Sequence, residues 1–281
     1  MAGRSKQFKV IDFHIHIGLK EHWHDWVNEY QEFTQSDFYK FYDELIVPAN
    51  FADYLQSRGI ERAVILPEMN PDVTGMVPNE YVLEFCSGRD IFIPFCTINP
   101  ALISRPKEEI KKLLRMGAKG IKLYPSYSHF YPNENYFHPI YEIAQERKIP
   151  VLVHTGSSVF KGAKIKYSDP IHLDDVAADF PNLSIVMAHS GRGIWYDKAF
   201  FLSRMHPNLF MEISGLPPKN LFKYFPDFER NIDKIVYGSD WPGIKSLSDN
   251  IESIKKLPLS SESIKKIFHD NAARILRLSE T

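Results

Sequence analysis

Eight short runs rich in β-branched and aromatic residues, with helix-like stretches between most of them, constrain the fold of this chain more than any other feature. Such runs predict strands, and strands that alternate with helices predict parallel β–α–β units. Eight units favour a closed α/β barrel, the (β/α)8 or TIM barrel. A doubly wound open sheet is the alternative, but no Gly-x-Gly-x-x-Gly motif follows an early strand. The runs are Val10–Gly18, Arg62–Glu68, Ile91–Ile98, Ala118–Tyr124, Val151–Thr155, Leu183–His189, Leu209–Ser214 and Lys234–Asp240.

The stretches between these runs support the same architecture. Lys107–Met116 and Phe137–Arg147 have helical periodicity, and the carboxylates that open Asp174–Phe180 suit a helix N-terminus. Pro94 is awkward inside the third run, because proline cannot donate a hydrogen bond to a sheet. At 281 residues the chain has the size of one barrel, so we expect residues 1–281 to form a single domain.

The first run, Val10–Gly18, reads Val-Ile-Asp-Phe-His-Ile-His-Ile-Gly. Successive side chains of a strand point to opposite faces, so the alternation predicts an apolar face under the helices and a polar face opposite. The apolar face would consist of Ile11, Phe13, Ile15 and Ile17, and the polar face of Asp12, His14 and His16. Two residues rise about 6.6 Å, which places the imidazoles roughly 7 Å apart. We favour a metal ion shared by this pair over two histidines satisfied by hydrogen bonds.

A long aromatic-rich segment, residues 19–48, follows the first run. In a barrel it lies on the rim where active sites form, so it is either a lid or pocket wall, or an extra helical pair that stabilises the barrel or a subunit contact. His22 and His24 form a second His-x-His here, outside any apparent strand, and we expect them at the surface.

Polar residues appear at the ends of the later apolar runs. His154, His189 and Asp240 close three runs, and Lys122 and Tyr124 lie at the end of another. A barrel brings the carboxyl ends of its strands to one mouth, where catalytic groups gather. Each residue alone could be structural, but five such endings, counting the histidine pair of the first run, predict an active site.

Bulk composition excludes several kinds of partner. Lys and Arg number 34 against 35 Asp and Glu, so no basic excess points to nucleic acid or an anionic membrane surface. No apolar run reaches the roughly 18 residues of a spanning helix, and the first residues lack the apolar core of a signal peptide. Cys86 and Cys96 are the only cysteines and are expected to be reduced core residues. We therefore expect a cytoplasmic protein.

The motifs resemble those of the amidohydrolase superfamily. His14-x-His16, His154, His189 and Gly-Ser-Asp240 carry this resemblance. It is greatest for the amidohydrolase-related branch that includes aminocarboxymuconate-semialdehyde decarboxylase. Supporting stretches are 120–125, 173–191 and 271–276, and the resemblance spans about residues 10–276.

The resemblance implies a metal centre. Its ligands would be His14, His16, His154 and Asp240. Three imidazoles and one carboxylate suit a single Zn2+, with Mn2+ or another divalent ion as alternatives. The metal would lower the pKa of a bound water from about 15.7 toward 7. The resemblance makes His189 the general base or a group that polarises the substrate, with Asp240 also able to pass the proton. The alternative is His189 as a ligand in a two-metal site.

The resemblance also implies substrate-binding groups. In two-metal branches a lysine at the position of Lys122 is carbamylated and bridges the ions, but we favour one metal and a free Lys122 that reaches a substrate carboxylate. Arg192 either binds a substrate anion, as an Arg fork fits a carboxylate, or makes a rim salt bridge. Tyr124 either donates a hydrogen bond to the substrate or packs at the rim.

Three functions are compatible with these residues. The first is metal-dependent hydrolysis, with metal-activated water attacking an amide, lactone or ester-like carbon of a small molecule. The second is non-oxidative decarboxylation of a small unsaturated or aromatic acid. The third is a non-catalytic metal-binding barrel. A nuclease is disfavoured by the balanced charge. We expect a substrate that carries a carboxylate, no nucleic-acid or membrane partner, and a subunit that could form a homodimer.

Overall fold

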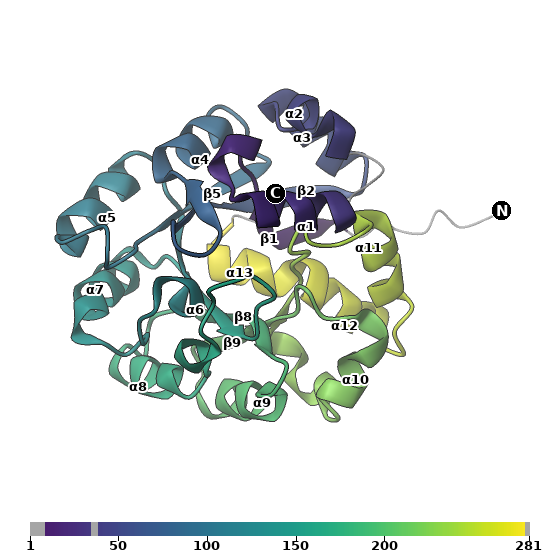
Figure 1. Cartoon of the computed structure of the whole chain (residues 1–281). Helices are drawn as coiled ribbons and strands as arrows, with labels where there is room; N and C mark the ends of the chain where they lie inside the picture. Colours follow the sequence, from purple (N-terminus) through teal and green to yellow (C-terminus); the bar gives the residue numbers. More distant parts are fainter. Residues whose placement is uncertain (1–8, 35–38, 279–281) are drawn as a thin grey trace.

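Eight parallel strands surrounded by helices form a TIM barrel, as the run pattern predicts (Figure 1). The computed structural model describes residues 9–34 and 39–278. The strands follow the order β1-β2-β5-β6-β7-β8-β9-β10, and every neighbouring pair along this order is parallel. Hydrogen bonds between the first strand and the residues that follow the last strand bring the two edges together: the Phe13 amide donates to the Tyr237 carbonyl (3.0 Å) and the His16 amide to the Trp241 carbonyl (2.8 Å).

The strands agree with the predicted runs to within a few residues. The barrel strands are β1 Val10–His16, β2 Ile60–Leu66, β5 Phe92–Thr97, β6 Gly120–Leu123, β7 Val151–Gly156, β8 Ile185–Arg192, β9 Leu209–Glu212 and β10 Ile235–Val236. A separate antiparallel hairpin consists of β3 Glu68–Asn70 and β4 Gly75–Val77. Pro94 lies inside β5, where its carbonyl still accepts a hydrogen bond from the Lys119 amide (2.8 Å).

The helices occupy the outside of the barrel (Figure 1). Their bounds are α1 Asp25–Thr34, α2 Tyr42–Leu45, α3 Pro48–Gln56, α4 Asn79–Cys86, α5 Pro106–Arg115, α6 Pro125–Ser128, α7 His138–Arg147, α8 His172–Asp179, α9 Tyr196–Met205, α10 Leu221–Tyr224, α11 Leu247–Lys255, α12 Ser261–Lys265 and α13 Asn271–Leu276. The three predicted helices correspond to α5, α7 and α8. In the described part of the chain, no helix is both long and apolar enough to cross a membrane.

The predicted alternation of β1 is wrong, because the strand contains a β-bulge. From Asp12 to Ile15 the strand advances three residues while β2 advances two, from Ala63 to Ile65. The Asp12 carboxylate caps the bulge by accepting the His14 amide (3.1 Å). An extra residue switches the face to which later side chains point.

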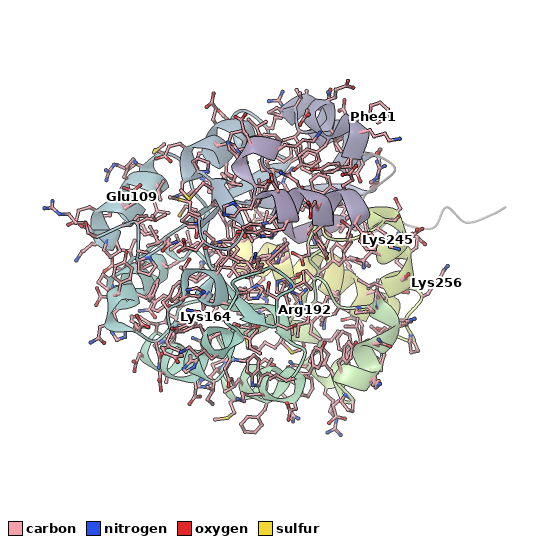
Figure 2. The ribbon with its side chains drawn as sticks, in the orientation of Figure 1. Phe41, Glu109, Lys164, Arg192, Lys245 and Lys256 are labelled. Atoms are coloured by element: carbon pink, nitrogen blue, oxygen red, sulfur yellow. The ribbon has the colours of Figure 1, made fainter. Side chains whose placement is uncertain are left out.

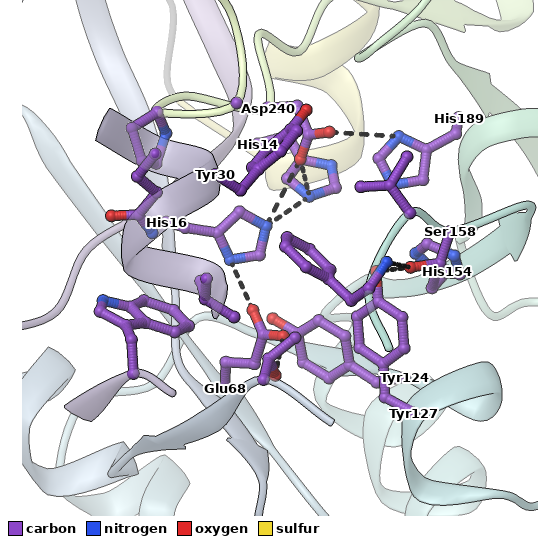
Figure 3. A pocket seen from close by; sticks show the side chains of 18 of the residues that line it. His14, His16, Tyr30, Glu68, Tyr124, Tyr127, His154, Ser158, His189 and Asp240 are labelled. Atoms are coloured by element: carbon purple, nitrogen blue, oxygen red, sulfur yellow. Dashed lines mark hydrogen bonds and ion pairs between the residues drawn. The ribbon is translucent and has the colours of Figure 1, made fainter. Parts of the chain in front are cut away.

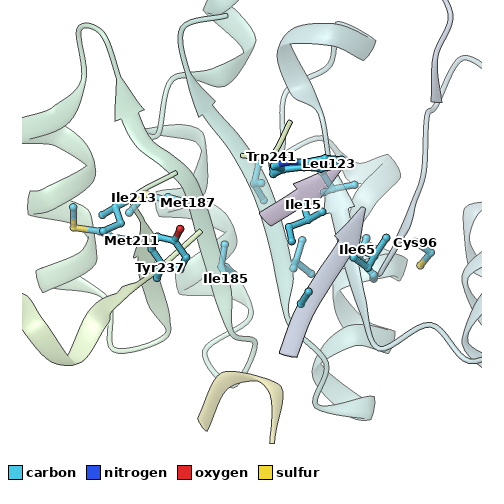
Figure 4. Close-up of a cluster of buried hydrophobic side chains, with 14 of the residues drawn as sticks. Ile15, Ile65, Cys96, Leu123, Ile185, Met187, Met211, Ile213, Tyr237 and Trp241 are labelled. Atoms are coloured by element: carbon cyan, nitrogen blue, oxygen red, sulfur yellow. The ribbon is translucent and has the colours of Figure 1, made fainter. Parts of the chain in front are cut away.

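As a result, the apolar residues of β1 divide between two cores. Ile11 and Phe13 join the cluster inside the barrel. Ile15 and Ile17 join the larger cluster that includes residues of the surrounding helices, part of which is drawn in Figure 4. The bulge therefore lets β1 fill the barrel with apolar side chains at its start and present His14 and His16 at its end. Both cysteines are free and buried, as predicted.

The rim segment forms part of the pocket wall and part of a supporting layer. Trp23, Val27 and Tyr30, on and just before α1, line the barrel mouth. Farther along, Tyr42 stacks on Trp241 with ring centroids 6.2 Å apart. Of the two alternatives for residues 19–48, a pocket wall describes the first part of the segment, and an extra helical layer that supports the barrel describes the second part. Residues 35–38 of this segment, which include the aromatic residue Phe38, lie outside the described residues.

His22 and His24 are partly buried, which corrects the expectation of surface histidines. The ring of His22 packs edge-on against Tyr81, with centroids 4.8 Å apart. His24 stacks on Trp26, and its Nε2 lies 2.5 Å from the Pro71 carbonyl. Both rings act as structural contacts within the rim.

Candidate metal centre and active site

One pocket at the mouth of the barrel contains every residue that the sequence analysis selected (Figure 3). Parallel strands of a barrel end on the same face, so residues far apart in the chain converge there. Arg192 lies near the centre of the face seen in Figure 2. The selected residues that line the pocket are His14, His16, Lys122, Tyr124, His154, His189, Arg192 and Asp240.

The two imidazoles of β1 and the carboxylate of Asp240 form the tightest cluster. His14 Nε2 lies 3.0 Å from His16 Nε2, far closer than the roughly 7 Å rise of two strand residues, because the rings lean toward each other. Asp240 Oδ1 lies 3.4 Å from His14 Nε2 and 3.5 Å from His16 Nε2. His14, His189 and Asp240 also offer ligand atoms that all lie within 4.8 Å of one another.

A buried carboxylate faces the Nδ1 atom of each imidazole. His14 Nδ1 lies 3.1 Å from Glu212 Oε2, and His16 Nδ1 lies 3.1 Å from Glu68 Oε2. When each Nδ1 carries the hydrogen and faces its carboxylate, both Nε2 atoms present lone pairs. Two lone pairs at 3.0 Å repel, so this arrangement needs a proton or a metal ion between them. The donor chemistry therefore fits a divalent cation.

His154 supplies a second indication of a metal site. Its Nε2 is buried and has no hydrogen-bond partner among the described residues. Its ring contacts that of His189, with centroids 4.8 Å apart. A buried polar atom without a partner is costly, and binding a metal would satisfy it. The chemistry of His14, His16 and Asp240 thus fits a divalent cation, while His154 adjoins this cluster through the ring of His189.

Burial and charge determine the protonation of the cluster. Burial lowers the pKa of His14, His154 and His189 well below the ordinary value of an imidazole. Burial alone would lower the pKa of His16, but the carboxylates of Asp240 and Glu68 raise it to about 9. Burial alone would raise the pKa of Asp240, yet the surrounding imidazoles hold it well below its usual range. Asp240 is therefore ionised, as a metal ligand must be.

Lys122 is fully buried within the site. Its Nζ lies 3.4 Å from His14 Nε2 and 5.0 Å from the centre of the Tyr124 ring. Burial lowers its pKa, while the Glu212 and Asp240 carboxylates oppose that shift. The amino group therefore lies in the pocket, beside the candidate metal ligand His14.

Glu212 is a structural member of the site that the sequence analysis missed. Its carboxylate accepts the Ser214 amide (2.6 Å), the Ser214 hydroxyl (2.8 Å) and the His189 amide (3.2 Å) besides facing His14. A Cβ at Gly238 would lie 2.1 Å from Glu212 Oε1, so only glycine fits there. Glu212 lies inside a predicted strand, and its charge within an apolar run was a usable signal.

Glu68 is a second missed residue. It ends the second predicted run, the position at which other titratable groups were selected, so the same rule would have found it. Besides facing His16, its carboxylate accepts the Thr74 hydroxyl (2.5 Å) and the Asn70 amide group (3.4 Å). Figure 3 shows Glu68 below His16, on the side away from Asp240.

Arg192 and Tyr124 already have partners within the protein. The Arg192 guanidinium donates to the Ser157 carbonyl (2.9 Å), and its Nη1 lies 3.6 Å from Asp240 Oδ2. These contacts leave other N–H groups of the fork available. The Tyr124 hydroxyl donates to the Pro67 carbonyl (2.7 Å), so in this conformation it can only accept a hydrogen bond from a substrate.

The rest of the pocket wall is mainly aromatic. Tyr30 packs edge-on against Phe160, with centroids 5.5 Å apart, and Tyr127 stacks on Tyr124. Trp23 completes the aromatic lining. Such a wall presents flat apolar ring faces and edges to the pocket.

The backbone is strained where the polar groups are presented. His189 and Asp240 adopt left-handed conformations, with φ of 62° and 64°. Such conformations cost about 1–3 kcal/mol and persist where the surrounding structure enforces them, often at functional sites. The Asp240 amide donates to the His14 carbonyl (2.9 Å), which helps to hold this turn against β1.

The fold and the buried cluster define a metal-dependent barrel enzyme. A family model confirms this class: the amidohydrolase model matches residues 11–278. The chain belongs to the amidohydrolase family, as the resemblance implied. No curated protein matches its sequence.

Solved structures share the fold over nearly the whole chain. An uncharacterised TIM-barrel protein from Bordetella bronchiseptica is 22% identical, with a TM-score of 0.80 and coverage of 96% of this chain and 98% of that one. A 5-carboxyvanillate decarboxylase from Novosphingobium aromaticivorans is 18% identical, with a TM-score of 0.69 and coverage of 96% of both chains. A probable 2-pyrone-4,6-dicarboxylic acid hydrolase from Acinetobacter baumannii is 14% identical, with a TM-score of 0.65 and coverage of 96% and 100%.

Proposed function

We propose that this enzyme removes carbon dioxide, without oxidation, from a small carboxylic acid with an aromatic or conjugated ring. The observation that carries the proposal is the combination of an aromatic wall with two cations, Lys122 and Arg192, beside the candidate metal ligands. The wall favours a conjugated ring, and such a ring can delocalise the electron pair that loss of carbon dioxide leaves behind. Decarboxylases of dihydroxybenzoate and carboxyvanillate are among the similar folds, which supports this choice.

The proposed metal ligands are His14, His16, His154 and Asp240. A divalent ion held by these residues would polarise a substrate oxygen and stabilise negative charge that develops on it. We favour one ion per chain. Zinc suits the ligands, and manganese is supported by its presence in the decarboxylase from Novosphingobium aromaticivorans.

The remaining polar groups then have distinct tasks. Arg192 and Lys122 would bind anionic substrate oxygens, Arg192 with the N–H groups that Ser157 and Asp240 leave available. The bond between the ring carbon and the carboxylate breaks, and a proton must reach that carbon. We assign this transfer to the pair His189 and Asp240, whose Nδ1 and Oδ2 lie 3.9 Å apart: the pair takes up a proton from water or from an acidic group of the substrate and passes it to that carbon.

Hydrolysis of a lactone or ester-like bond is the second candidate function. Burial keeps His189 neutral, and a neutral imidazole beside the ionised Asp240 can accept a proton from water. The structural similarity to a probable pyrone dicarboxylate hydrolase favours it. The sequence favoured hydrolysis over decarboxylation. We now place decarboxylation first because of the aromatic wall. A cytoplasmic location and a single domain over 1–281 stay predictions from the sequence.

A substrate panel tests the proposal. Enzyme loaded with Mn2+ or Zn2+ is incubated with 2,6-dihydroxybenzoate, 5-carboxyvanillate and 2-pyrone-4,6-dicarboxylate in water labelled with 18O. Carbon dioxide release without label in the ring product supports decarboxylation. Label in an opened product without carbon dioxide establishes hydrolysis instead. His189→Asn, which retains the metal ligands, is the control for contaminating activity. A metal-loaded enzyme that turns over none of the three contradicts the proposed substrate class.

A further inference from the structure

The β3–β4 hairpin contacts both the candidate metal centre and the rim wall. Glu68, on β3, faces His16 Nδ1 at 3.1 Å and is almost completely buried. Its other oxygen accepts the hydroxyl of Thr74, in the turn of the same hairpin, at 2.5 Å. Two side chains, Thr74 and Glu68, thus connect the turn to Nδ1 of His16, the ring nitrogen opposite the one that would bind the metal.

The same turn holds the start of the rim segment. The carbonyl of Thr74 accepts the His24 amide (3.0 Å), and the carbonyl of Val73 accepts the Trp26 indole N–H (2.8 Å). Trp23 forms a β-bridge with Gly75. These contacts attach the N-terminal part of α1 to the residues that orient the Glu68 carboxylate.

That part of the rim is also the wall of the pocket. Trp23, Val27 and Tyr30 line the site, and all three lie within a few residues of the hairpin contacts. The base of the hairpin is in turn fixed to the barrel, because the Asn99 amide group donates to the Met69 carbonyl (2.7 Å) and the Ser128 hydroxyl to Asn70 Oδ1 (2.6 Å). Because the base of the hairpin is fixed, the turn is the part of the hairpin that contacts both the rim wall and the Glu68 carboxylate beside His16.

We propose that Glu68 is a positioning residue for His16 and that the β3–β4 hairpin couples the rim wall to the metal centre. Glu68 holds the hydrogen of His16 on Nδ1, which leaves Nε2 free to bind the ion. Thr74 holds Glu68, and the backbone of the turn holds α1. A change in the wall therefore changes metal affinity although no wall residue binds the metal. The inference rests on the metal centre proposed above.

The test measures Mn2+ affinity of the full chain by titration, together with the melting temperature of the metal-free protein. Glu68→Gln should weaken Mn2+ binding about 10–100-fold. Thr74→Val has a similar shape and removes only the hydroxyl, and it should weaken binding several-fold. Trp26→Phe removes the hydrogen bond to Val73 without touching the pocket, and it should also weaken binding.

Tyr141→Phe is the matched control. Its hydroxyl donates to the Pro132 carbonyl (2.7 Å), so this variant also loses one buried side-chain bond to a backbone carbonyl, away from the hairpin. It should bind Mn2+ like the wild type. Binding shifts that merely followed lower melting temperatures would appear in this variant too.

The outcomes separate this inference from the proposed function. If Glu68→Gln and Thr74→Val both bind Mn2+ as tightly as the wild type, Glu68 does not position His16. If Trp26→Phe binds Mn2+ as tightly as the control Tyr141→Phe while Glu68→Gln and Thr74→Val bind it more weakly, the proposed coupling between the rim wall and the metal centre is wrong. If the wild type binds neither Mn2+ nor Zn2+, the proposed metal centre itself fails.

Discussion

His14 Nδ1 lies 3.1 Å from Glu212 Oε2 although 198 residues separate them in the chain. The contact joins the first strand to β9 inside the barrel, where both side chains are almost fully excluded from water. A histidine that donates from Nδ1 to a carboxylate presents Nε2 for metal binding, and the carboxylate increases the basicity of the ring. The site therefore depends on a residue that would not contact the metal.

Glu212→Gln should weaken metal binding about 10–100-fold and lower the free energy of unfolding by about 1–3 kcal/mol. Both oxygens of Glu212 face hydrogen-bond donors in the wild type. In the variant, the N–H2 group of glutamine replaces one of these acceptors with another donor. Metal titration and urea unfolding measure the two effects. Glu252→Gln, on the exposed surface of α11, is the control and should change neither. Unchanged metal affinity in Glu212→Gln would show that Glu212 does not orient His14 for metal binding.

His14→Ala and Asp240→Ala should each abolish metal binding, whereas His189→Asn should keep one metal per chain and lose turnover. The first two remove ligands from the tightest cluster, and the third removes only the proposed proton-transfer group. Elemental analysis of the purified variants measures the stoichiometry, and circular dichroism checks that they fold. Loss of metal from His189→Asn would instead favour a two-metal site.

Lys122→Met should leave the metal stoichiometry at one and raise KM for an acid substrate at least tenfold. The variant keeps the length of the side chain but removes the charge beside His14. Metal analysis and steady-state kinetics, both with added bicarbonate, measure the effects. A drop from two metals in the wild type to fewer in Lys122→Met would show that this lysine bridges two ions as a carbamate.

Gly238→Ala should destabilise the barrel by about 1–3 kcal/mol and disrupt metal binding, because the new Cβ would clash with Glu212 Oε1 and with the His14 Cβ, 2.8 Å away. Gly117→Ala is the contrast: its φ of +115° disfavours alanine, but nothing lies within 4 Å of the added atom. That variant should lose stability while it retains metal affinity. Equal metal affinity in both variants would contradict the steric argument.

Stability should rise with pH between about 8 and 10.5 through Lys234. Burial, with the nearby Arg274 charge, lowers the pKa of Lys234 to about 8 from 10.5. In that interval the unfolded chain binds the proton and the folded chain does not, so the free energy of unfolding increases with pH. The effect is the difference between the wild type and Lys234→Met in urea unfolding at pH 7, 8.5 and 10. A difference that stays constant over this range would contradict the shifted pKa.

Much of the architecture could be predicted because local patterns reflect it directly. All eight strands lie where β-rich runs were predicted, since a strand buried on both faces requires consecutive apolar residues. The mouth residues could be selected because parallel strands end on one face. The alternation of Val10–Gly18 misled, because a bulge is set by pairing with β2 and by the cap from Asp12, and periodicity alone does not reveal it.

By itself, the sequence determined the barrel, the residues at its mouth and their likeness to the amidohydrolase family, because strand composition and strand-end chemistry are local properties. Only the tertiary structure decided that Glu68 and Glu212 stand behind His16 and His14, that Tyr124 donates to Pro67, and that α1 forms part of the wall. These are contacts across strands and loops far apart in the chain. Their geometry depends on how the barrel closes and where β1 bulges, and neither is written in any one segment.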